Sequence, residues 1–381
     1  MTVDSLGGAW QFRAGVTYLN HGSFGAVPLL VRAAQQSLRQ RCEDQPMDFL
    51  VRDFESLWLA ARRELTLWLG THEQNIALCE NATAGMNELA SWFPLAPGDE
   101  VLLNEHEYGA VKRIWQRRCQ QSAATIRYLQ LPGQVDDPDQ IVETIVGACS
   151  HRTRLVVVSH ITSPSAMIMP VEQLCPKLRD LGIAVCVDGP HALLQQSINL
   201  NQLDCDFYTA SCHKWLCAPI GSGFLFIHPR WHDQAEPLRL SWGRLPPEQP
   251  SQWSDEFLWT GTRDCSAMLS IPAAIDFFRQ VAMAELDQRN HALARYTRTQ
   301  LLELPGTQPL YADSRQLYGW MVAIKLPVGD HNTLQERLWS IYRIEVPVHF
   351  LDGRFLIRVS CHAYNTERDI DALLNALSQE L

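Results

Sequence analysis

The sequence lacks the marks of several protein classes. It contains no window of about 18 charge-free apolar residues, so no membrane span is predicted. Residues 1–15 carry Asp4 and no apolar segment of the kind found in secretory signal peptides. Positive charge is scarce: 32 Lys and Arg stand against 42 Asp and Glu, which argues against a nucleic-acid-binding face. We therefore expect neither a membrane nor a nucleic acid as a partner.

Closely spaced cysteine pairs are also missing. The chain has 11 cysteines, an odd number, and no two of them have the C-x-x-C spacing of a zinc ribbon or a redox pair. A chain of this length does not need disulfides for stability. We expect free thiols in a reducing compartment, which predicts a cytoplasmic protein.

What is present is the pattern of an α/β protein. The 381 residues are 46% apolar, which allows a sizeable core and two domains, or one large domain with an appendage. Short apolar runs predict strands that are buried on both faces, and they alternate with helix-like segments. The strand-like runs are 101–103, 126–131, 155–159, 183–187, 207–210 and 224–227, and the helix-like segments lie near 85–93, 110–120, 138–148 and 171–180. The alternation predicts a mainly parallel sheet wrapped by helices.

Two details predict departures from a regular parallel sheet. Residues 126–131 alternate between apolar and polar side chains, which favours a position nearer the edge. The last runs lie too close together in the chain for a helix between every pair. We therefore expect one antiparallel strand.

The pattern changes after about residue 242. Prolines and tryptophans in residues 242–261 predict an ordered loop region. Helical periodicity then returns, and it is mixed with short apolar runs in an α+β order. The helices are expected at 272–288, 291–304, 334–342 and from Glu367, and the apolar runs lie at 321–326 and 354–360. We predict an N-terminal arm (1–15), a large domain (16–264) and a small C-terminal domain (265–381).

Two charged residues follow apolar runs directly. Lys214 comes after the run 207–210, and a lysine at the carboxyl end of a strand is a candidate for covalent bonding to a carbonyl group. Asp188 ends the run 183–187, where open α/β sheets bind ligands, and it could keep a heteroaromatic ring nitrogen protonated. Alone, Lys214 is also consistent with a surface lysine and Asp188 with a helix N-cap. Their joint presence on strands of one sheet favours a cofactor site.

An anion site and a stacking ring are expected nearby. Residues 81–85 (Asn-Ala-Thr-Ala-Gly) precede a helix-like segment, so backbone N–H groups and Thr83 could bind an anion there. Ordinary helix capping is the alternative. His106 and Tyr108 follow the run 101–103 and could stack on a flat ring, or simply pack at the edge of the core.

Arg358 is the third charged candidate. It lies within the apolar run 354–360, and a buried arginine is costly unless it meets an anion. The anion could be a ligand. The alternative is a structural pairing with an acidic side chain such as Asp369.

These motifs together resemble the class V aminotransferase-fold enzymes, which are fold-type I proteins that depend on pyridoxal phosphate (PLP). The resemblance covers nearly the whole chain. It lies in Asn81-Ala-Thr83-Ala-Gly85, Asp188, Ser211-x-His213-Lys214, Gly261-Thr262 and Arg358-Val-Ser-x-x-x-Tyr364-Asn365-Thr366. Residues 18–25 (Tyr-Leu-Asn-His-Gly-Ser-Phe-Gly), 159–164 (Ser-His-Ile-Thr-Ser-Pro) and 261–264 (Gly-Thr-Arg-Asp) resemble the isopenicillin N epimerase-like branch of that class.

The resemblance implies a role for each matched residue at the cofactor ring. Lys214 would bind the cofactor covalently and move the proton at the substrate Cα. Asp188 would pair with the pyridine nitrogen, and His191 would lie near the phenolic oxygen. His106 matches the position of a stacking histidine in desulfurase-like relatives, and Tyr108 is the competing assignment.

The other implied roles concern the phosphate, the substrate and a second subunit. Thr83, Ser211 and His213 would hold the phosphate, with Ala82 and Ser163 as further cofactor contacts. Gly261 and Thr262 would reach the phosphate in the neighbouring subunit, which implies a homodimer with shared active sites. Arg358 would clamp the α-carboxylate of a small amino-acid substrate. With the histidines assigned in this way, no metal site is expected.

The implied chemistry is removal of the Cα proton from an amino acid or a peptide-like amine. Return of a proton on the opposite face would make the protein an epimerase or racemase, which we place first. That reaction needs a second acid, for which His21, Tyr108 and His160 are candidates. Loss of a β-substituent would make it a C–S β-lyase, similar to cysteine or hercynylcysteine sulfoxide lyases, and this is the alternative.

Other activities rank lower. Cysteine desulfurases of this class need a nucleophilic cysteine before the final strand, and residues 342–355 contain none. Transamination is not what the nearest branch suggests. The intact set of Lys214, Asp188 and Arg358 argues against a PLP-fold protein kept only for binding. No G-x-G-x-x-G follows an early strand, so a dinucleotide site is not expected.

Overall fold

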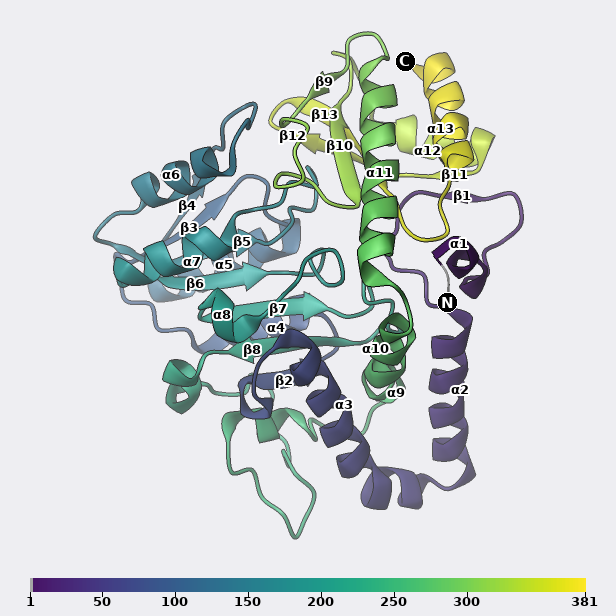
Figure 1. Cartoon of the computed structure of the whole chain (residues 1–381). Helices are drawn as coiled ribbons and strands as arrows, with labels where there is room; N and C mark the ends of the chain where they lie inside the picture. Colours follow the sequence, from purple (N-terminus) through teal and green to yellow (C-terminus); the bar gives the residue numbers. More distant parts are fainter. Residues whose placement is uncertain (1–2) are drawn as a thin grey trace.

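A computed structural model describes residues 3–381 of the chain (Figure 1). Met1 and Thr2 of the predicted N-terminal arm lie outside the described residues. The large sheet has seven strands in the order β2-β8-β7-β6-β5-β3-β4. Its strands are β2 (Ile76–Cys79), β3 (Glu100–Asn104), β4 (Thr125–Leu129), β5 (Thr153–Ser159), β6 (Ala184–Asp188), β7 (Phe207–Ser211) and β8 (Gly223–Ile227).

The predicted topology of the large sheet is confirmed. β4, β3, β5, β6 and β7 pair in parallel, whereas β8 runs antiparallel to both of its neighbours, β7 and β2. The alternating run at 126–131 forms β4, and it lies at the edge as expected. β2 was not predicted, because it is only four residues long and its partner β8 lies far along the chain.

Helices cover both faces of this sheet. α4 (Ala82–Trp92) and α5 (Gly109–Ser122) pack on one face, where Trp115 and Phe93 join apolar side chains from alternate strand positions. The other face packs against α3 (Phe54–Leu69), α6 (Pro138–Ala148), α7 (Val171–Asp180) and α10 (Ile271–Arg279). Because successive strand residues point to opposite faces, both faces of the strands are buried, as the apolar runs predicted, except in the edge strand β4, whose residues are exposed or half-buried.

A second sheet of four strands lies beside the long helix α11 (Figure 1). Its order is β12-β13-β10-β9, with all pairs antiparallel. The strands are β9 (Gln308–Pro309), β10 (Met321–Lys325), β12 (Val348–Leu351) and β13 (Arg354–Ser360), and the helices of this part are α11 (Met283–Leu302), α12 (Leu334–Tyr342) and α13 (Glu367–Glu380).

The N-terminal segment joins this second part of the molecule. β1 (Thr17–Tyr18) pairs in parallel with β11 (Ile344–Glu345). The remaining helices are α1 (Val3–Leu6), α2 (Leu29–Asp44), α8 (Leu200–Leu203) and α9 (Ser266–Leu269). One apolar cluster extends from Val3 to Leu377, so the core runs through both sheets. The division into 1–15, 16–264 and 265–381 stays a prediction.

One predicted helix boundary is wrong. We expected helices over 272–288 and from His291, but the structure ends α10 at Arg279 and begins α11 at Met283. The chain tightens here, since the N–H of Val281 donates to the carbonyl of Phe278, and the Val281 side chain turns into the core. The amphipathic pattern continues on both sides of the break, which conceals it in the sequence.

Other predictions concern the thiols and the membrane. All 11 cysteines are free, as expected. Among residues 3–381, no helix has both the length and the apolar character needed to cross a bilayer.

Candidate active site

Polar residues meet at the edge of the large sheet where its parallel strands end. Asp188 is the last residue of β6, and Ser211 is the last residue of β7. In the strand register Asp188 lies beside Ser159 of β5 on one side and Thr209 of β7 on the other. The carboxyl ends of parallel strands lie at one edge of the sheet. Lys214 follows the end of β7 in the chain and therefore lies at the same edge as Asp188.

Lys214 and Asp188 influence each other at this edge. Burial raises the pKa of Asp188 to about 7, and the positive charge of Lys214 opposes that rise. Burial lowers the pKa of Lys214 to about 8, with Arg358 acting in the same direction and Asp188 against it. A substantial fraction of Lys214 is therefore neutral near pH 8, which is what a nucleophile or a base requires.

His191 contacts the lysine directly. Its Nε2 lies 3.4 Å from Lys214 Nζ, and its Nδ1 accepts a hydrogen bond from Trp215 Nε1 at 3.3 Å. Burial and then the charge of Lys214 hold the pKa of His191 well below its usual value, so the ring is neutral. The structure thus brings together three residues that the sequence predicted for one site: Lys214, Asp188 and His191.

The N-terminus of α4 lies against the end of β7. The N–H of Ala82 donates to Ser211 Oγ at 3.0 Å, and Asn81 Oδ1 caps the helix by accepting from the N–H of Ala84 at 2.9 Å. Thr83 is exposed at the first turn. Nearby, His213 Nδ1 is buried with no hydrogen-bond partner among the described residues. The N–H groups of Ala82 and Ala84 are thus paired within the chain, and what this end of the site offers to an anion is the positive end of the helix dipole, the Thr83 side chain and an unpaired ring nitrogen.

Gly85 shows how tightly this helix packs. A Cβ at Gly85 would lie 2.4 Å from Thr209 Oγ1, so the helix approaches β7 only because the residue is glycine. This close packing of α4 on β7 fixes the position of the N-terminus of α4 relative to the ends of the strands. Gly85 therefore belongs to the architecture of the anion site.

Of the two aromatic candidates, Tyr108 lies at the lysine. Lys214 Nζ lies 5.9 Å from the centroid of the Tyr108 ring. His106 instead has its Nδ1 2.6 Å from Ser165 Oγ and its Nε2 3.5 Å from Glu105. The geometry favours Tyr108 as the ring that lies next to the reactive amine.

Arg358 is buried without an acidic partner. It donates to the carbonyl of Ser163 at 2.6 Å, to Ser23 Oγ at 2.9 Å and to Asn20 Oδ1 at 3.3 Å, all of them neutral oxygens. The alternative pairing with Asp369 is not formed, because that carboxylate caps α13 by accepting from the N–H of Thr366 at 2.8 Å.

The electrostatics of Arg358 follow from this lack of a counter-charge. Burial lowers the pKa of Arg358 to about 10. Among residues 3–381, no carboxylate forms an ion pair with it. A buried, uncompensated guanidinium is stabilised by an incoming carboxylate. Arg358 therefore fits the role of a substrate clamp.

His21 contacts the loop that carries Lys214, which we call the lysine loop. Its Nδ1 lies 2.8 Å from the hydroxyl of Tyr364, its Nε2 lies 3.2 Å from the backbone carbonyl of Lys214, and its ring stacks on His362. Burial lowers the pKa of His21 to about 3, which disfavours the protonated form. Both ring nitrogens are engaged, so the geometry suits a structural support better than the predicted acid.

Gly25 allows the N-terminal segment to pack closely against the lysine loop. A Cβ on Gly25 would lie 2.2 Å from the carbonyl oxygen of Lys214. Any larger residue would push the segment away from the lysine. Residues 20–25 thus contact both the lysine loop and, through Asn20 and Ser23, the guanidinium of Arg358.

The remaining predicted residues are less directly placed. The Gly261 carbonyl accepts from Arg263 Nη1 at 3.2 Å, and Thr262 is exposed. Neither hydrogen-bonds to Lys214 or Asp188 within the described chain, so their role across a subunit interface stays a prediction. His160 Nδ1 lies 3.0 Å from the Tyr208 hydroxyl.

Sequence reasoning missed Glu107. Its carboxylate is buried and accepts hydrogen bonds from the N–H of Ser159 at 3.0 Å, from Ser159 Oγ at 2.6 Å and from Asn104 Nδ2. Burial raises the pKa of Glu107 to about 7 against these hydrogen bonds. Because Ser159 neighbours Asp188, Glu107 lies behind the site. An acid between a histidine and a tyrosine in a loop gives no sequence signal of burial.

Sequence reasoning also missed His349, on β12. It lies opposite Leu356 of β13, two residues from Arg358. Burial, and then the charge of Arg358, lowers the pKa of His349 to about 4. In the sequence this histidine belongs to a short hairpin with no motif around it.

One cluster near the lysine loop contains possible metal ligands. The ligand atoms of His21, Cys217 and His362 lie within 4.8 Å of one another. However, the two imidazole rings stack at 4.1 Å with an interplanar angle of 18°, so their planes are nearly parallel. Both Nε2 atoms contact Cys217 Sγ, at 3.6 and 3.7 Å, and burial raises the pKa of that thiol well above its usual value, so the cluster is better described as a thiol packed between two rings.

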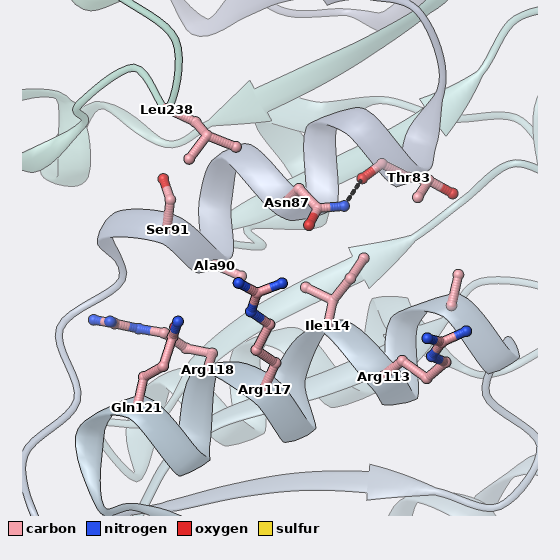
Figure 2. Close-up of a pocket in the computed structure, with 11 residues that line it drawn as sticks. Thr83, Asn87, Ala90, Ser91, Arg113, Ile114, Arg117, Arg118, Gln121 and Leu238 are labelled. Atoms are coloured by element: carbon pink, nitrogen blue, oxygen red, sulfur yellow. Dashed lines mark hydrogen bonds between the residues drawn. The ribbon is translucent and has the colours of Figure 1, made fainter.

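A second concentration of positive charge lies in a groove between α4 and α5, which extends along the two helices from Thr83 (Figure 2). Its volume is about 520 Å³. Arg113, Arg117 and Arg118 line it from α5, and Figure 2 shows them beside Ile114 below the small side chains of α4. No acidic residue lines this α4–α5 groove.

Comparisons with known proteins agree with the geometry. Residues 47–373 match the Aminotransferase class-V family. The chain is 36% identical to the isopenicillin N epimerase of Streptomyces clavuligerus, over 95% of this chain and 94% of that protein. It is also 36% identical to that of Amycolatopsis lactamdurans, over 96% and 95%. An L-cysteine desulfhydrase of Arabidopsis thaliana is 26% identical, over 96% and 88%.

A solved structure has the same fold. The cystine C–S lyase C-DES, in complex with cysteine persulfide, superposes with a TM-score of 0.84 at 21% identity, over 96% of this chain and 98% of that one. At this identity the likeness concerns the fold alone.

Proposed function

Because this chain belongs to the class V aminotransferase family, we propose that it is an amino-acid epimerase of the isopenicillin N epimerase type. The chain is a PLP-dependent enzyme with the fold-type I architecture. The proposed reaction inverts the configuration at Cα of an amino acid or a peptide-like amine. The observation that carries the proposal is the 36% identity to two isopenicillin N epimerases over 95% and 96% of the chain. The uncompensated Arg358 and a lysine whose pKa is lowered to about 8 support chemistry at Cα.

The residues present fit the cofactor. PLP offers an aldehyde, a ring nitrogen, a flat ring and a phosphate. Lys214 supplies an amine, Asp188 a buried carboxylate and Tyr108 a flat ring beside the amine. At the other end, the N-terminus of α4 and the unpaired Nδ1 of His213 suit the phosphate.

Each of these residues has a definable task. When bound, PLP withdraws electrons from the substrate Cα and so makes its hydrogen acidic. The buried carboxylate of Asp188 would hold a proton at the ring nitrogen by pairing its negative charge with the protonated ring. Arg358 binds the α-carboxylate through its two terminal nitrogens and orients Cα toward Lys214. Lys214 takes the Cα proton as the neutral amine.

A second candidate function is β-elimination at a C–S bond. The relationship to an L-cysteine desulfhydrase over 96% of the chain favours it. It needs the same Lys214, Asp188 and Arg358, but a substrate with a leaving group at Cβ in place of a second proton donor. Persulfide-forming desulfurase chemistry ranks last, because Cys361 is buried and burial raises its pKa to about 12.

We further propose a cytoplasmic homodimer with shared active sites. Large apolar side chains are unusually exposed, with Phe24 at 65% and Ile220 at 67%. Phe24 precedes Gly25, which packs on the Lys214 backbone, so a second subunit that covered Phe24 would lie next to the active site. The exposed Thr262 is available to a second subunit, and eleven free cysteines suit a reducing compartment.

The first test is the cofactor. We expect the purified protein to be yellow, and borohydride reduction followed by peptide mapping to find the cofactor on Lys214. Lys177, an exposed lysine on α7, serves as the internal control peptide and is expected to be unmodified. A colourless protein that takes up no PLP would refute the assignment.

The second test separates the two reactions. The holoenzyme is incubated in deuterated water with isopenicillin N and, separately, with L-cysteine. Epimerisation predicts deuterium at Cα together with inversion of isopenicillin N. Release of pyruvate and sulfide from L-cysteine, without inversion of isopenicillin N, would replace the epimerase proposal with the lyase.

A further inference from the structure

His349 shares a sheet face with the substrate clamp. It pairs directly with Leu356 across the antiparallel strands β12 and β13. Residues opposite each other in such a pair point to the same face, and Arg358 follows Leu356 by two positions on that face. The face is turned toward the active site, because Arg358 there contacts Ser23 and Ser163.

The imidazole of His349 has an unused nitrogen. Its Nε2 is buried and has no hydrogen-bond partner among the described residues. A buried polar atom without a hydrogen-bond partner is destabilising, and a ligand contact removes that cost. The ring is neutral at neutral pH, since burial and Arg358 lower its pKa to about 4. A neutral imidazole with a free nitrogen can accept a proton.

The other candidates for a second proton-transferring group are engaged or lie on the lysine's side. Both ring nitrogens of His21 have partners, and His160 has its Nδ1 3.0 Å from the hydroxyl of Tyr208 and its Nε2 3.6 Å from the Glu172 carboxylate of α7. Tyr108 has its ring over Lys214 Nζ. His349 instead lies on β12 of the four-stranded sheet. A substrate held by Arg358 would therefore have Lys214 from the large-sheet edge on one side and His349 from the four-stranded sheet on the other.

We propose that His349 is the second proton-transferring residue, acting on Cα from the face opposite Lys214, an inference that rests on the proposed epimerase function. In one direction neutral His349 accepts the Cα proton while the Lys214 ammonium donates a proton to the other face. In the reverse direction the neutral amine of Lys214 accepts and the His349 imidazolium donates, a form that the bound substrate carboxylate favours by neutralising the charge of Arg358. Exchange with solvent then returns each group to its starting protonation state.

The test uses the holoenzyme and the variant His349→Gln, with isopenicillin N and its Cα epimer as probes in deuterated water. Inversion is expected to fall by about 10²–10⁴-fold, the usual contribution of a general acid or base. Lys214 is intact in this variant. One of the two epimers is therefore expected to exchange its Cα hydrogen for deuterium with retention, within about threefold of the wild-type exchange rate.

A binding measurement separates this role from a structural one. The apparent dissociation constant of isopenicillin N, taken from the change in cofactor absorbance, is expected to stay within about threefold of wild type, because Arg358 still binds the carboxylate. His151→Gln, which changes an exposed histidine, is the matched control and is expected to behave as wild type. Inversion by His349→Gln at the wild-type rate would overturn the inference, and so would equal loss of exchange for both epimers.

A second readout does not depend on turnover. In holoenzyme with ¹³C-labelled histidine, the His349 resonance is identified by its loss in His349→Gln. Adding L-alanine is expected to raise the pKa of His349, since the carboxylate neutralises the nearby charge of Arg358. An unmoved resonance, while the cofactor absorbance reports binding, would refute contact with the substrate. A wild-type enzyme that does not invert isopenicillin N would refute the proposed function itself.

Discussion

The molecule gathers positive charge in two places, the edge that holds Lys214 and Arg358 and the α4–α5 groove that holds Arg113, Arg117 and Arg118. At the edge the charges are removed from water, and burial lowers the pKa values of Lys214 and Arg358 to about 8 and about 10. In the groove, Arg113 and Arg117 are exposed to solvent. The two regions have similar residue types, but desolvation makes only the first one reactive.

The largest expected effect comes from removing the amine at the edge. Lys214→Ala is expected to lower turnover by about 10³-fold or more, because the base is lost together with the covalent link to the cofactor. Steady-state kinetics with isopenicillin N measures this. Lys177→Ala, which removes an exposed lysine on α7, is expected to retain wild-type turnover. Full turnover by Lys214→Ala would mean that the buried edge is not the reactive region.

The next effect concerns the clamp. Arg358→Gln is expected to weaken transition-state binding by about 2–5 kcal/mol, the usual cost of truncating one partner of a buried charge pair. We expect a large fall in kcat/KM. The free energy of unfolding is not expected to fall by a matching amount, because the variant also removes an uncompensated charge. Kinetics and urea unfolding of the same preparation measure the two quantities.

Arg117→Gln is the matched control for the clamp, since it makes the same substitution in the α4–α5 groove. If Arg358→Gln lost stability and activity in proportion, the guanidinium would be structural. The contrast between the two arginines would then disappear.

A smaller effect is expected in the pH dependence of cofactor uptake. Only the neutral amine attacks an aldehyde, so the rate at which apoenzyme takes up PLP should rise with pH and level off above the pKa of Lys214. We expect the midpoint near pH 8, where burial places that pKa, and not near the ordinary value of 10.5. Stopped-flow absorbance from pH 6 to 10 measures it. A rate that still rises steeply at pH 10 would show that burial does not activate the amine.

The smallest effect belongs to the groove. Arg113→Gln and Arg117→Gln are expected to change the free energy of unfolding by less than about 0.5 kcal/mol, because exposed side chains without buried partners contribute little. Turnover is also expected to be unchanged. Thermal unfolding and steady-state assays provide the check. If either variant lost activity, the α4–α5 groove would take part in the reaction, and the contrast with the edge that holds Lys214 would not hold.

The residues that could be predicted from the sequence are those whose position follows from a strand end. Asp188 and Lys214 come directly after apolar runs, and the shared edge of a parallel sheet then brings them together. Local pattern also points to Arg358 and to the anion site at α4, and the resemblance to a known class assigns them the substrate carboxylate and the cofactor phosphate. Local pattern was sufficient in these cases, because each residue sits at a fixed offset from a regular element.

The residues that could not be predicted depend on contacts between distant segments. Glu107 is buried because Ser159, on another strand, donates to it. His349 faces the site because of the register between β12 and β13, and the support of Lys214 by His21 spans nearly 200 residues. A short window of sequence does not show which distant segments come into contact.

The pairing of β1 with β11 has a consequence for synthesis of the protein on the ribosome. Asn20 and Arg358, which meet beneath this pairing, are separated by 338 residues. The first strand must therefore wait, unpaired, until almost the entire chain has emerged. Contacts between such distant segments form late and slow folding. A nascent chain can form the strands around Asp188 before β13 is made, but it acquires Arg358, and the contacts of His21 with Tyr364 and His362, only after β13 has emerged.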